Sequence, residues 1–305
     1  MPWTTLEQLW NRTINPQTGN TSSEESWNKE VETLYRMGIG MEEAIRYLYQ
    51  EQPDFESFKI WINERKTDTE TVSAADIPDV LSLEDLAFWQ ENGYVIIKDA
   101  ISKEDCKATQ QAIWEFLEMN PDDRESWYKR HEEQRGLMLN FHNHETLNRN
   151  RLSPRIQKAY EQLYKTTKIY KTIDKVSFNP PETNNFKFLG SPLHWDVSLK
   201  QPIPFGLQGL LYLTDCDPND GAFHCVPGFH TKIDSWLNGL EPHINPREEA
   251  LATLQPVPVV AKAGDFIIWQ NTLPHCASPN HGNVPRMVQY LTYFPDDFKS
   301  AEEWI

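Results

Sequence analysis

The run GLQGLLYLT at residues 206–214 indicates the fold class of the second half of the chain. It is short, apolar and partly aromatic, and it follows a proline, as is typical of a buried β-strand. Three similar runs lie downstream, at residues 257–261, 265–269 and 287–294, with Pro and Gly between them. Short strands without intervening helices are typical of a barrel or jelly roll.

Helical patterns precede these strands. We expect a helix at residues 83–92, a strand at 94–98, a second helix that begins at Ser102, and an amphipathic helix from Pro154 through Leu163. Ser102 is a good N-cap, with Asp105 three residues further on. The predicted fold is therefore mainly β with flanking helices.

Residues 1–75 form a separate helical pattern. Apolar residues recur there at a spacing of three to four, interrupted by Gly38, Gly40 and Pro53. The polar stretch at residues 66–75 is typical of a linker. We predict an N-terminal helical appendage at residues 1–75 and a catalytic domain at 76–305. The apolar side of the appendage needs a surface to bury against, so we expect it to cover one face of the barrel or to mediate an oligomer contact. The oligomeric state stays open.

Composition narrows the partners and the compartment. The net charge of -16 repels nucleic acid and anionic lipid surfaces. No stretch approaches the ~20 apolar residues of a membrane helix, and no leader pattern is present at the N-terminus. The 4 cysteines contain no C-x-x-C pair, which favours reduced thiols. We therefore expect a cytoplasmic protein with a small-molecule substrate and no nucleic-acid or membrane partner.

The tripeptide His194-Trp195-Asp196 is the sharpest local feature. On an extended strand, residues two apart project to the same face, so an imidazole and a carboxylate can converge on one ion. Such a tripeptide alone occurs by chance in many proteins. A facial triad of two His and one carboxylate needs a third ligand. His275, which follows the predicted strand at residues 264–269, is the best candidate.

Arg286 opens the next predicted strand and lies eleven residues after His275. A hairpin there would bring its guanidinium close to the metal pocket. Arginine forks onto a carboxylate with two charge-assisted bonds, which suits the far carboxylate of 2-oxoglutarate. Gln208 shares strand parity with Leu210 and Tyr212, and it either contacts 2-oxoglutarate or satisfies a hydrogen bond in the core.

The ordered set of motifs between about residues 81 and 295 resembles the phytanoyl-CoA dioxygenase family. The set comprises the segment at 83–97, His194-x-Asp196, the strand at 206–215, the DGAFHCVPGFH motif at 220–230, His275, Asn280 and Arg286. The resemblance implies a double-stranded β-helix, a jelly roll of the cupin type. It also implies Fe(II) on His194, Asp196 and His275, 2-oxoglutarate on Arg286, and O2 as oxidant.

Two departures from the family pattern bear on the pocket. Relatives often have Ser or Thr two residues after the second His, whereas this chain has Ala277, so that hydroxyl is lost or supplied by Ser278. The Leu/Tyr run at 210–213 replaces a common Trp, which leaves the shape of the substrate pocket open. Related halogenases lack the carboxylate ligand, so Asp196 favours hydroxylation.

The resemblance implies an oxygenase that oxidises, most simply hydroxylates, a small organic or natural-product-like substrate and releases succinate and CO2. Two rival functions remain: a cupin-like metal protein that uses no 2-oxoglutarate, and a binding or sensor protein that keeps the fold without catalysis. Arg286 discriminates against the first, because such proteins have no dicarboxylate to hold. Cys276 is not expected to act as a nucleophile, because only His275 adjoins it.

Overall fold

A computed structural model describes residues 2–15, 24–67 and 77–298. Its α-helices are α1 (Pro2–Ile14), α2 (Glu24–Arg36), α3 (Met41–Glu51), α4 (Phe55–Arg65), α5 (Leu83–Asn92), α6 (Lys103–Phe116), α7 (Glu145–Arg151), α8 (Pro154–Tyr164), α9 (Ile233–Gly239) and α10 (Pro246–Thr253). Short 3-10 helices span Arg124–Tyr128 and Phe229–Thr231. No helix among these residues is both long enough and apolar enough to span a membrane.

The strands are β1 (Tyr94–Ile97), β2 (Gln134–Arg135), β3 (Met138–Leu139), β4 (Ile169–Lys171), β5 (Val176–Asn179), β6 (Leu207–Tyr212), β7 (Phe223–Cys225), β8 (Val257–Val259), β9 (Phe266–Gln270), β10 (His275–Ala277), β11 (Arg286–Tyr290) and β12 (Tyr293–Pro295). They form a seven-stranded sheet in the order β1-β9-β6-β11-β5-β3-β2, a three-stranded sheet β10-β7-β8 and a pair β12-β4. Every pairing is antiparallel.

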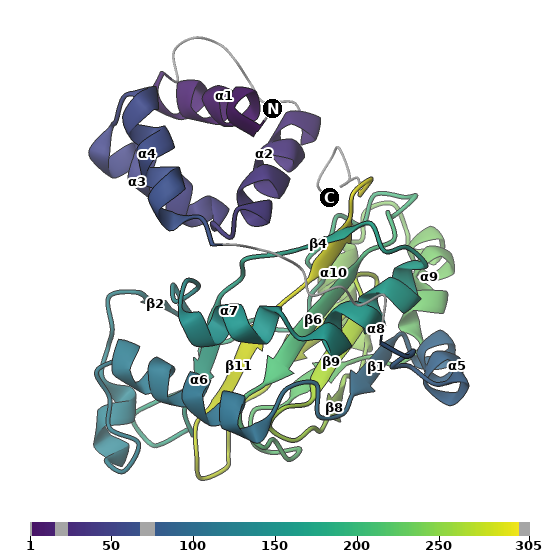
Figure 1. Cartoon of the computed structure of the whole chain (residues 1–305). Coiled ribbons are helices and arrows are strands. Elements are labelled where there is room, and N and C mark those ends of the chain that lie inside the picture. Colours follow the sequence, from purple (N-terminus) through teal and green to yellow (C-terminus); the bar gives the residue numbers. More distant parts are fainter. Residues whose placement is uncertain (1, 16–23, 68–76, 299–305) are drawn as a thin grey trace.

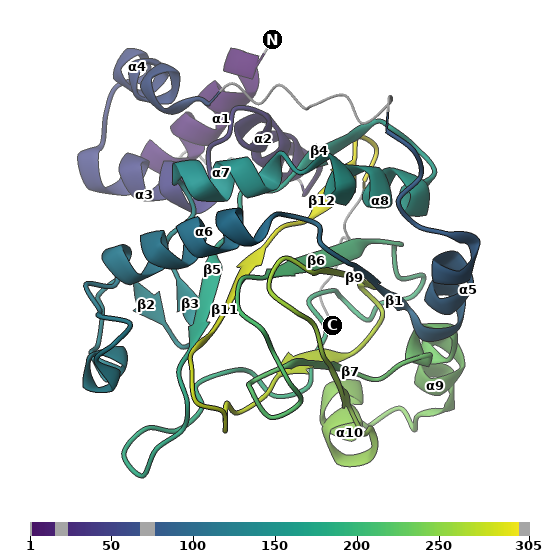
Figure 2. The same cartoon turned by 60° about the horizontal axis from the view of Figure 1, so that its bottom comes forward.

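Alternation along β6 shows how the layers are built. Leu207 and Leu211 belong to an apolar cluster with Ile113 of α6 and Tyr160 of α8, whereas Leu210 belongs to a second cluster, which also contains residues of β7 and β8. The seven-stranded sheet therefore has one face under helices and the other against the small sheet. Figure 2 shows α6, α7 and α8 lying along the same side of this sheet.

This cover of helices corrects the prediction of a mainly β protein. Among the described residues, helical positions outnumber strand positions, so the fold is a mixture of helices and antiparallel sheets. The excess arises because α1–α4 form their own bundle and because the outer face of the large sheet is apolar and needs a helical layer over it.

The N-terminal helices pack around a separate apolar cluster, which includes Leu9, Leu34, Leu48 and Phe58. Figure 1 places this bundle beside one end of the sheets, close to β4. Ion pairs join it to the rest of the chain, among them Arg36–Asp296, Arg46–Glu133 and Lys175–Glu42. The predicted boundary at 75/76 and most of the predicted linker lie outside the described residues, so the division into two domains stays a prediction.

Several predicted elements match the structure closely. Helix α5 spans residues 83–92, and a capping box of Ser82 and Asp85 starts it. Ser102 caps α6 by accepting a hydrogen bond from the backbone N–H of Asp105. The predicted strand at 287–294 is instead two strands, β11 and β12, which belong to different sheets.

Candidate active site

The three residues of the predicted triad meet where the seven-stranded sheet and the three-stranded sheet face each other. His275 is the first residue of β10, and His194 pairs with it as an isolated antiparallel bridge. Two backbone hydrogen bonds join them: His194 N–H donates to His275 O over 2.9 Å, and His275 N–H donates to His194 O over 3.0 Å. The backbone itself therefore holds the two imidazoles side by side.

The expectation that His194 and Asp196 lie on a regular strand was wrong. The chain makes a single bridge at His194 and then bends at Asp196. The reason lies in Arg247 of α10, whose guanidinium donates to the carbonyl oxygens of Trp195 over 2.9 Å and Val197 over 2.8 Å. These carbonyls bind a side chain instead of a neighbouring strand, yet the side chains of His194 and Asp196 still converge.

The donor atoms are close enough to share one ion. Asp196 Oδ1 lies 3.4 Å from His194 Nε2, and Asp196 Oδ2 lies 3.2 Å from His275 Nε2. The three ligand atoms lie within 4.8 Å of one another. Two imidazoles and one carboxylate, gathered on one side, are the donor set of the facial triad that binds non-haem iron. The residues therefore fit an Fe(II) ion.

Backbone carbonyls orient both imidazoles. The Nδ1–H of His194 donates to Pro192 O over 2.7 Å, and that of His275 donates to Leu273 O over 3.1 Å. A histidine that donates from Nδ1 keeps the lone pair of Nε2 for a metal. Both rings thus present Nε2 toward Asp196.

Charge at this cluster also suits a cation. Burial raises the pKa of Asp196, but its interactions with the two histidines outweigh burial and hold that pKa far below its usual value. Burial lowers the pKa of His194, but Asp196 outweighs it, and the pKa of His194 lies above its usual value. Asp196 thus stays ionised, as a carboxylate ligand of Fe(II) must.

Gln208 contacts Asp196 through its side-chain amide. Its Nε2 donates to Asp196 Oδ2 over 2.8 Å, and its Oε1 accepts from Nε1 of Trp269 over 3.1 Å. Both ends of the amide are therefore engaged within the chain, and Gln208 acts on the carboxylate of the triad. The bond with the buried Trp269 is a core hydrogen bond, one of the two roles that the sequence allowed, and the bond to Asp196 adds a contact that it did not indicate; a contact with 2-oxoglutarate stays a prediction.

Arg286 is a buried cation, and some of the hydrogen-bond donors of its side chain have no protein partner among the described residues. The residue is 1% exposed, and its guanidinium lies 5.6 Å from the ring centroid of Tyr212. Among the described residues, its Nε and Nη1 have no hydrogen-bond acceptor. Leaving buried charged donors unpaired is costly, so these donors are available to a ligand with acceptor oxygens.

The expected hairpin between His275 and Arg286 is absent. Strand β10 lies in the three-stranded sheet and β11 in the seven-stranded one, so the connection crosses from one sheet to the other. The crossing places the histidine and the arginine on opposite layers that face each other. Arg286 still begins its strand, as predicted.

One cavity of about 710 Å³ contains the triad, Gln208 and Arg286. Cys276 and Ala277 also line this cavity. Burial raises the pKa of the Cys276 thiol to about 11, so it is protonated at neutral pH and a poor nucleophile, as the sequence indicated. A volume of this size matches the ~300–1,000 Å³ of typical small-molecule sites.

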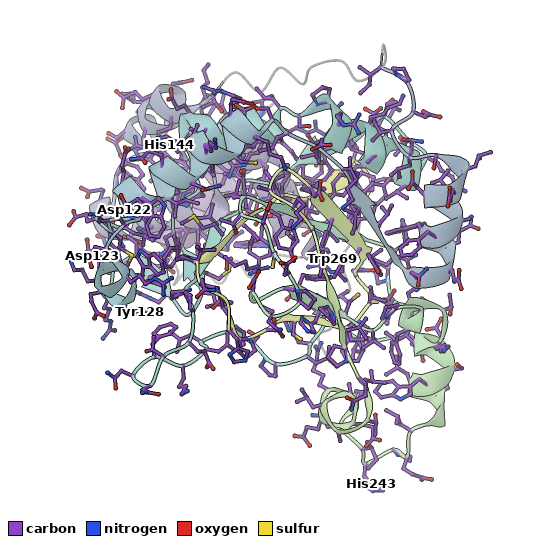
Figure 3. All side chains as sticks on the ribbon, turned by 90° about the horizontal axis from the view of Figure 1, so that it is seen from below. Asp122, Asp123, Tyr128, His144, His243 and Trp269 are labelled. Atoms are coloured by element: carbon purple, nitrogen blue, oxygen red, sulfur yellow. The ribbon has the colours of Figure 1, made fainter. Side chains whose placement is uncertain are left out.

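Two contributors to this site escaped the sequence analysis. Arg247 gave no local signal, because it acts on backbone carbonyls from a distant helix. Trp269 could have been found, since its place in a predicted strand gives it a side that faces the cavity. Figure 3 shows Trp269 in the interior between the sheets, whereas His144 and His243 lie toward the periphery.

Comparisons with known proteins agree with this site. The model of the family "Phytanoyl-CoA dioxygenase (PhyH)" matches residues 89–288, more than half of the chain. A protein of Dictyostelium discoideum named "Putative phytanoyl-CoA dioxygenase" is 22% identical over 258 residues, which cover 68% of this chain and 74% of that protein.

Solved structures share the fold at low identity. AviO1 from Streptomyces viridochromogenes Tue57 has a TM-score of 0.54 and 17% identity, over 74% of this chain and 100% of that one. SnoN, described as a non-heme alpha ketoglutarate dependent epimerase from nogalamycin biosynthesis, has a TM-score of 0.52 and 18% identity, over 70% of this chain and 82% of its own. The family match and the triad lead to one conclusion: the chain belongs to the phytanoyl-CoA dioxygenase family of iron- and 2-oxoglutarate-dependent oxygenases.

Proposed function

We propose that this oxygenase hydroxylates a small organic substrate, with His194, Asp196 and His275 as its iron ligands and Arg286 as the anchor for the distal carboxylate of 2-oxoglutarate. Its products are then succinate, CO2 and the hydroxylated substrate. The face-to-face packing of the seven-stranded and three-stranded sheets supports a double-stranded β-helix as the core. The four free thiols support a reducing, cytoplasmic setting.

One observation carries the proposal: a buried guanidinium with unpartnered donors shares a cavity with a facial triad. A metal protein that needs no dicarboxylate has no reason to bury such a group. The rival reading as a cupin-like protein without 2-oxoglutarate leaves the Nε and Nη1 of Arg286 without a partner among the described residues. A binding protein that has lost catalysis is distinguished by the absence of succinate release.

The chain's own residues supply geometry and charge. Iron, when bound, supplies the activation of O2 and the oxidising power for breaking a substrate C–H bond. The Nδ1–H bonds of His194 and His275 fix the rings, and Gln208 fixes the carboxylate of Asp196. Arg286 binds one end of the dicarboxylate, which leaves the keto-acid end to face the triad.

Hydroxylation is favoured over halogenation by the carboxylate of Asp196, which occupies the position where halogenases admit chloride. Many relatives place a Ser or Thr hydroxyl near 2-oxoglutarate, whereas this chain has Ala277 at that position. Ser278, the alternative donor, instead donates its hydroxyl to Ala222 O over 3.1 Å. We therefore expect Arg286 to carry the distal carboxylate with less help than in relatives.

The test is an anaerobic titration of 2-oxoglutarate into the Fe(II) protein, followed by the visible charge-transfer band of an Fe(II)–keto-acid chelate. We expect a saturable band in the wild type, and succinate release once O2 is admitted, even without substrate. A wild-type protein that binds Fe(II) but develops no band with 2-oxoglutarate would contradict the proposal and favour the cupin-like alternative.

A further inference from the structure

The cavity that contains the triad does not end within the sheets. Its wall continues onto the N-terminal bundle, where Tyr35 of α2 and Met41, Glu42 and Ile45 of α3 line it. Trp27 of α2 also lines it, and Arg12 lies 5.7 Å from the centroid of its ring. The bundle therefore forms the outer end of the same chamber whose inner end carries Arg286.

The bundle is fixed in this position by polar contacts with the core. His142 Nε2 lies 3.2 Å from Glu43 Oε2, and Arg46 Nη1 lies 2.9 Å from Glu133 Oε1. An added Cβ at Gly40 would lie only 3.2 Å from the ring of His142, so the backbone of α3 begins in close contact with the core. The outer wall is thus packed in place.

Asp174 lies on the cavity wall between the two ends. Its Oδ2 accepts a hydrogen bond from Thr172 Oγ1 over 2.6 Å. Arg151, a buried cation, donates to the backbone carbonyl of Asp174 over 2.8 Å. Among the described residues no hydrogen bond or ion pair reaches Asp174 Oδ1, so this carboxylate faces the chamber with one oxygen available.

The charges that line the chamber indicate which kind of ligand group would pair with the carboxylate of Asp174. Lys175 is paired with Glu42, and Arg151 donates to the backbone carbonyl of Asp174; burial outweighs the charges of Arg151 and Lys175, and the pKa of Asp174 lies above its usual value. Arg135, at the rim, is exposed and donates to the backbone oxygens of Glu132 and Gln134. A partly buried carboxylate whose burial is not fully offset by nearby cations is stabilised when a ligand supplies a charged donor.

From these observations we infer that helices α2 and α3 form the wall of the substrate chamber, and that the substrate is an amine with an apolar body whose ammonium group pairs with Asp174. This inference rests on the proposed function and specifies the substrate class. The apolar body lies against Met41, Ile45 and the neighbouring aromatic side chains. An anionic substrate such as a CoA thioester would meet Asp174 and Glu42 with like charge.

The test uses three probes that share one ring system and differ in their polar group: naphthylethylamine, naphthylethanol and naphthylacetate. Their binding to the full-length protein, loaded anaerobically with Fe(II) and 2-oxoglutarate, is measured by equilibrium dialysis. We expect the amine to bind about tenfold or more tighter than the acid, as a partly buried charge-assisted bond implies, with the alcohol between them. Equal binding of amine and acid, or tighter binding of the acid, overturns the inference.

Two pairs of variants locate the binding site. Asp174→Asn should remove the preference for the amine, whereas Asp79→Asn, on the surface, should keep it. Ile45→Trp fills the chamber and should weaken binding of all three probes, whereas Ile60→Trp, at a position that is 59% exposed on α4, should not. If Asp174→Asn keeps the preference, or if the two Trp variants bind alike, the inference fails.

The charge-transfer band separates this inference from the proposed function. All four variants should keep the band, because none of these residues belongs to the triad or to the Arg286 anchor. If the wild type lacks the band, the proposed function fails, and the probe series is then measured on the metal-free protein. The preference for the amine and its loss in Asp174→Asn decide the inference there as well.

Discussion

The inner and outer ends of the cavity are formed by different secondary-structure elements. The inner end is made by residues of the sheets and their connections, and each of its polar groups has a defined orientation: His275 on β10, Arg286 on β11 and Gln208 on β6. The outer end is made by α2, α3 and the segment at residues 173–175, with aromatic and aliphatic side chains and the charged Glu42, Asp174 and Lys175.

This difference separates chemistry from selectivity. The inner end needs fixed distances between particular atoms, so its residue types are restricted and recognisable. The outer end needs only shape and one or two polar groups, which many sequences can supply. Substitutions at the inner end should therefore affect the iron and 2-oxoglutarate, and those at the outer end should leave both intact.

The largest effect at the inner end is expected for His275→Ala. Removal of an imidazole leaves two ligands, and iron-dependent turnover should be lost, while circular dichroism should show an intact fold. Succinate formation from 2-oxoglutarate measures the effect. The matched control is His243→Ala, at an exposed position outside the cavity, which should behave as the wild type. Full activity in the His275 variant would remove it from the triad.

Arg286→Ala should have the next largest effect. Stranding one partner of a buried charge-assisted pair costs about 3–5 kcal/mol. At ~1.4 kcal/mol per tenfold, the Kd for 2-oxoglutarate should rise by a factor of about a hundred or more. Arg286→Lys should rescue only part of this, since lysine keeps the charge and loses the fork.

The charge-transfer titration measures the Kd of these Arg286 variants, and iron affinity serves as an internal control because Arg286 is not a ligand. Arg149→Ala, an exposed arginine on α7, is the matched variant. An Arg286→Ala protein that binds 2-oxoglutarate as tightly as the wild type would place the co-substrate elsewhere.

A smaller effect is expected for Gln208→Ala. Loss of a residue that orients a metal ligand typically costs about 10–100-fold in metal affinity. Iron binding should weaken by that factor, and the Kd for 2-oxoglutarate should change less, because the amide of Gln208 bonds to Asp196 and Trp269. If the variant instead loses only 2-oxoglutarate binding, Gln208 contacts the co-substrate directly. Gln157→Ala on α8 serves as the control.

Among these variants, Leu48→Ala in the N-terminal bundle is expected to affect binding of iron and 2-oxoglutarate least. Leu48 is 0% exposed, and its truncation should cost about 2–5 kcal/mol of unfolding free energy in the bundle, whereas Tyr49→Ala, at a position that is 63% exposed, should cost little. Urea unfolding measures the stability. The charge-transfer band should be unchanged in both folded variants; its loss in Leu48→Ala would couple the bundle to the metal site.

Local sequence signals predicted much of the fold. The N-cap Ser102 predicted one helix start, the pattern at residues 83–92 predicted α5, and the short apolar runs located β6, β8 and β9 within one or two residues. These signals act within a few residues, where backbone sterics and burial dominate. The pairing of strands into two sheets was less accessible, since it depends on contacts between segments far apart in the chain.

The same distinction applies to the site. His194, Asp196, His275 and Arg286 could be named because their spacing and order are unusual for a non-functional sequence. The bend at Asp196 could not be predicted, because Arg247 on a distant helix causes it. The contribution of Tyr35 and Asp174 to the cavity was also hidden, because no local pattern marks a residue that lines a cavity only after tertiary packing.

The backbone bridge between His194 and His275 has a consequence for the life cycle of the enzyme. Neither of its two hydrogen bonds involves an atom that binds metal, so both persist when iron leaves. If iron binds as proposed, we expect it to dissociate and return without refolding, with reactivation limited by metal supply rather than by chain rearrangement. A cell that passes through iron starvation would retain a pool of intact, reloadable protein.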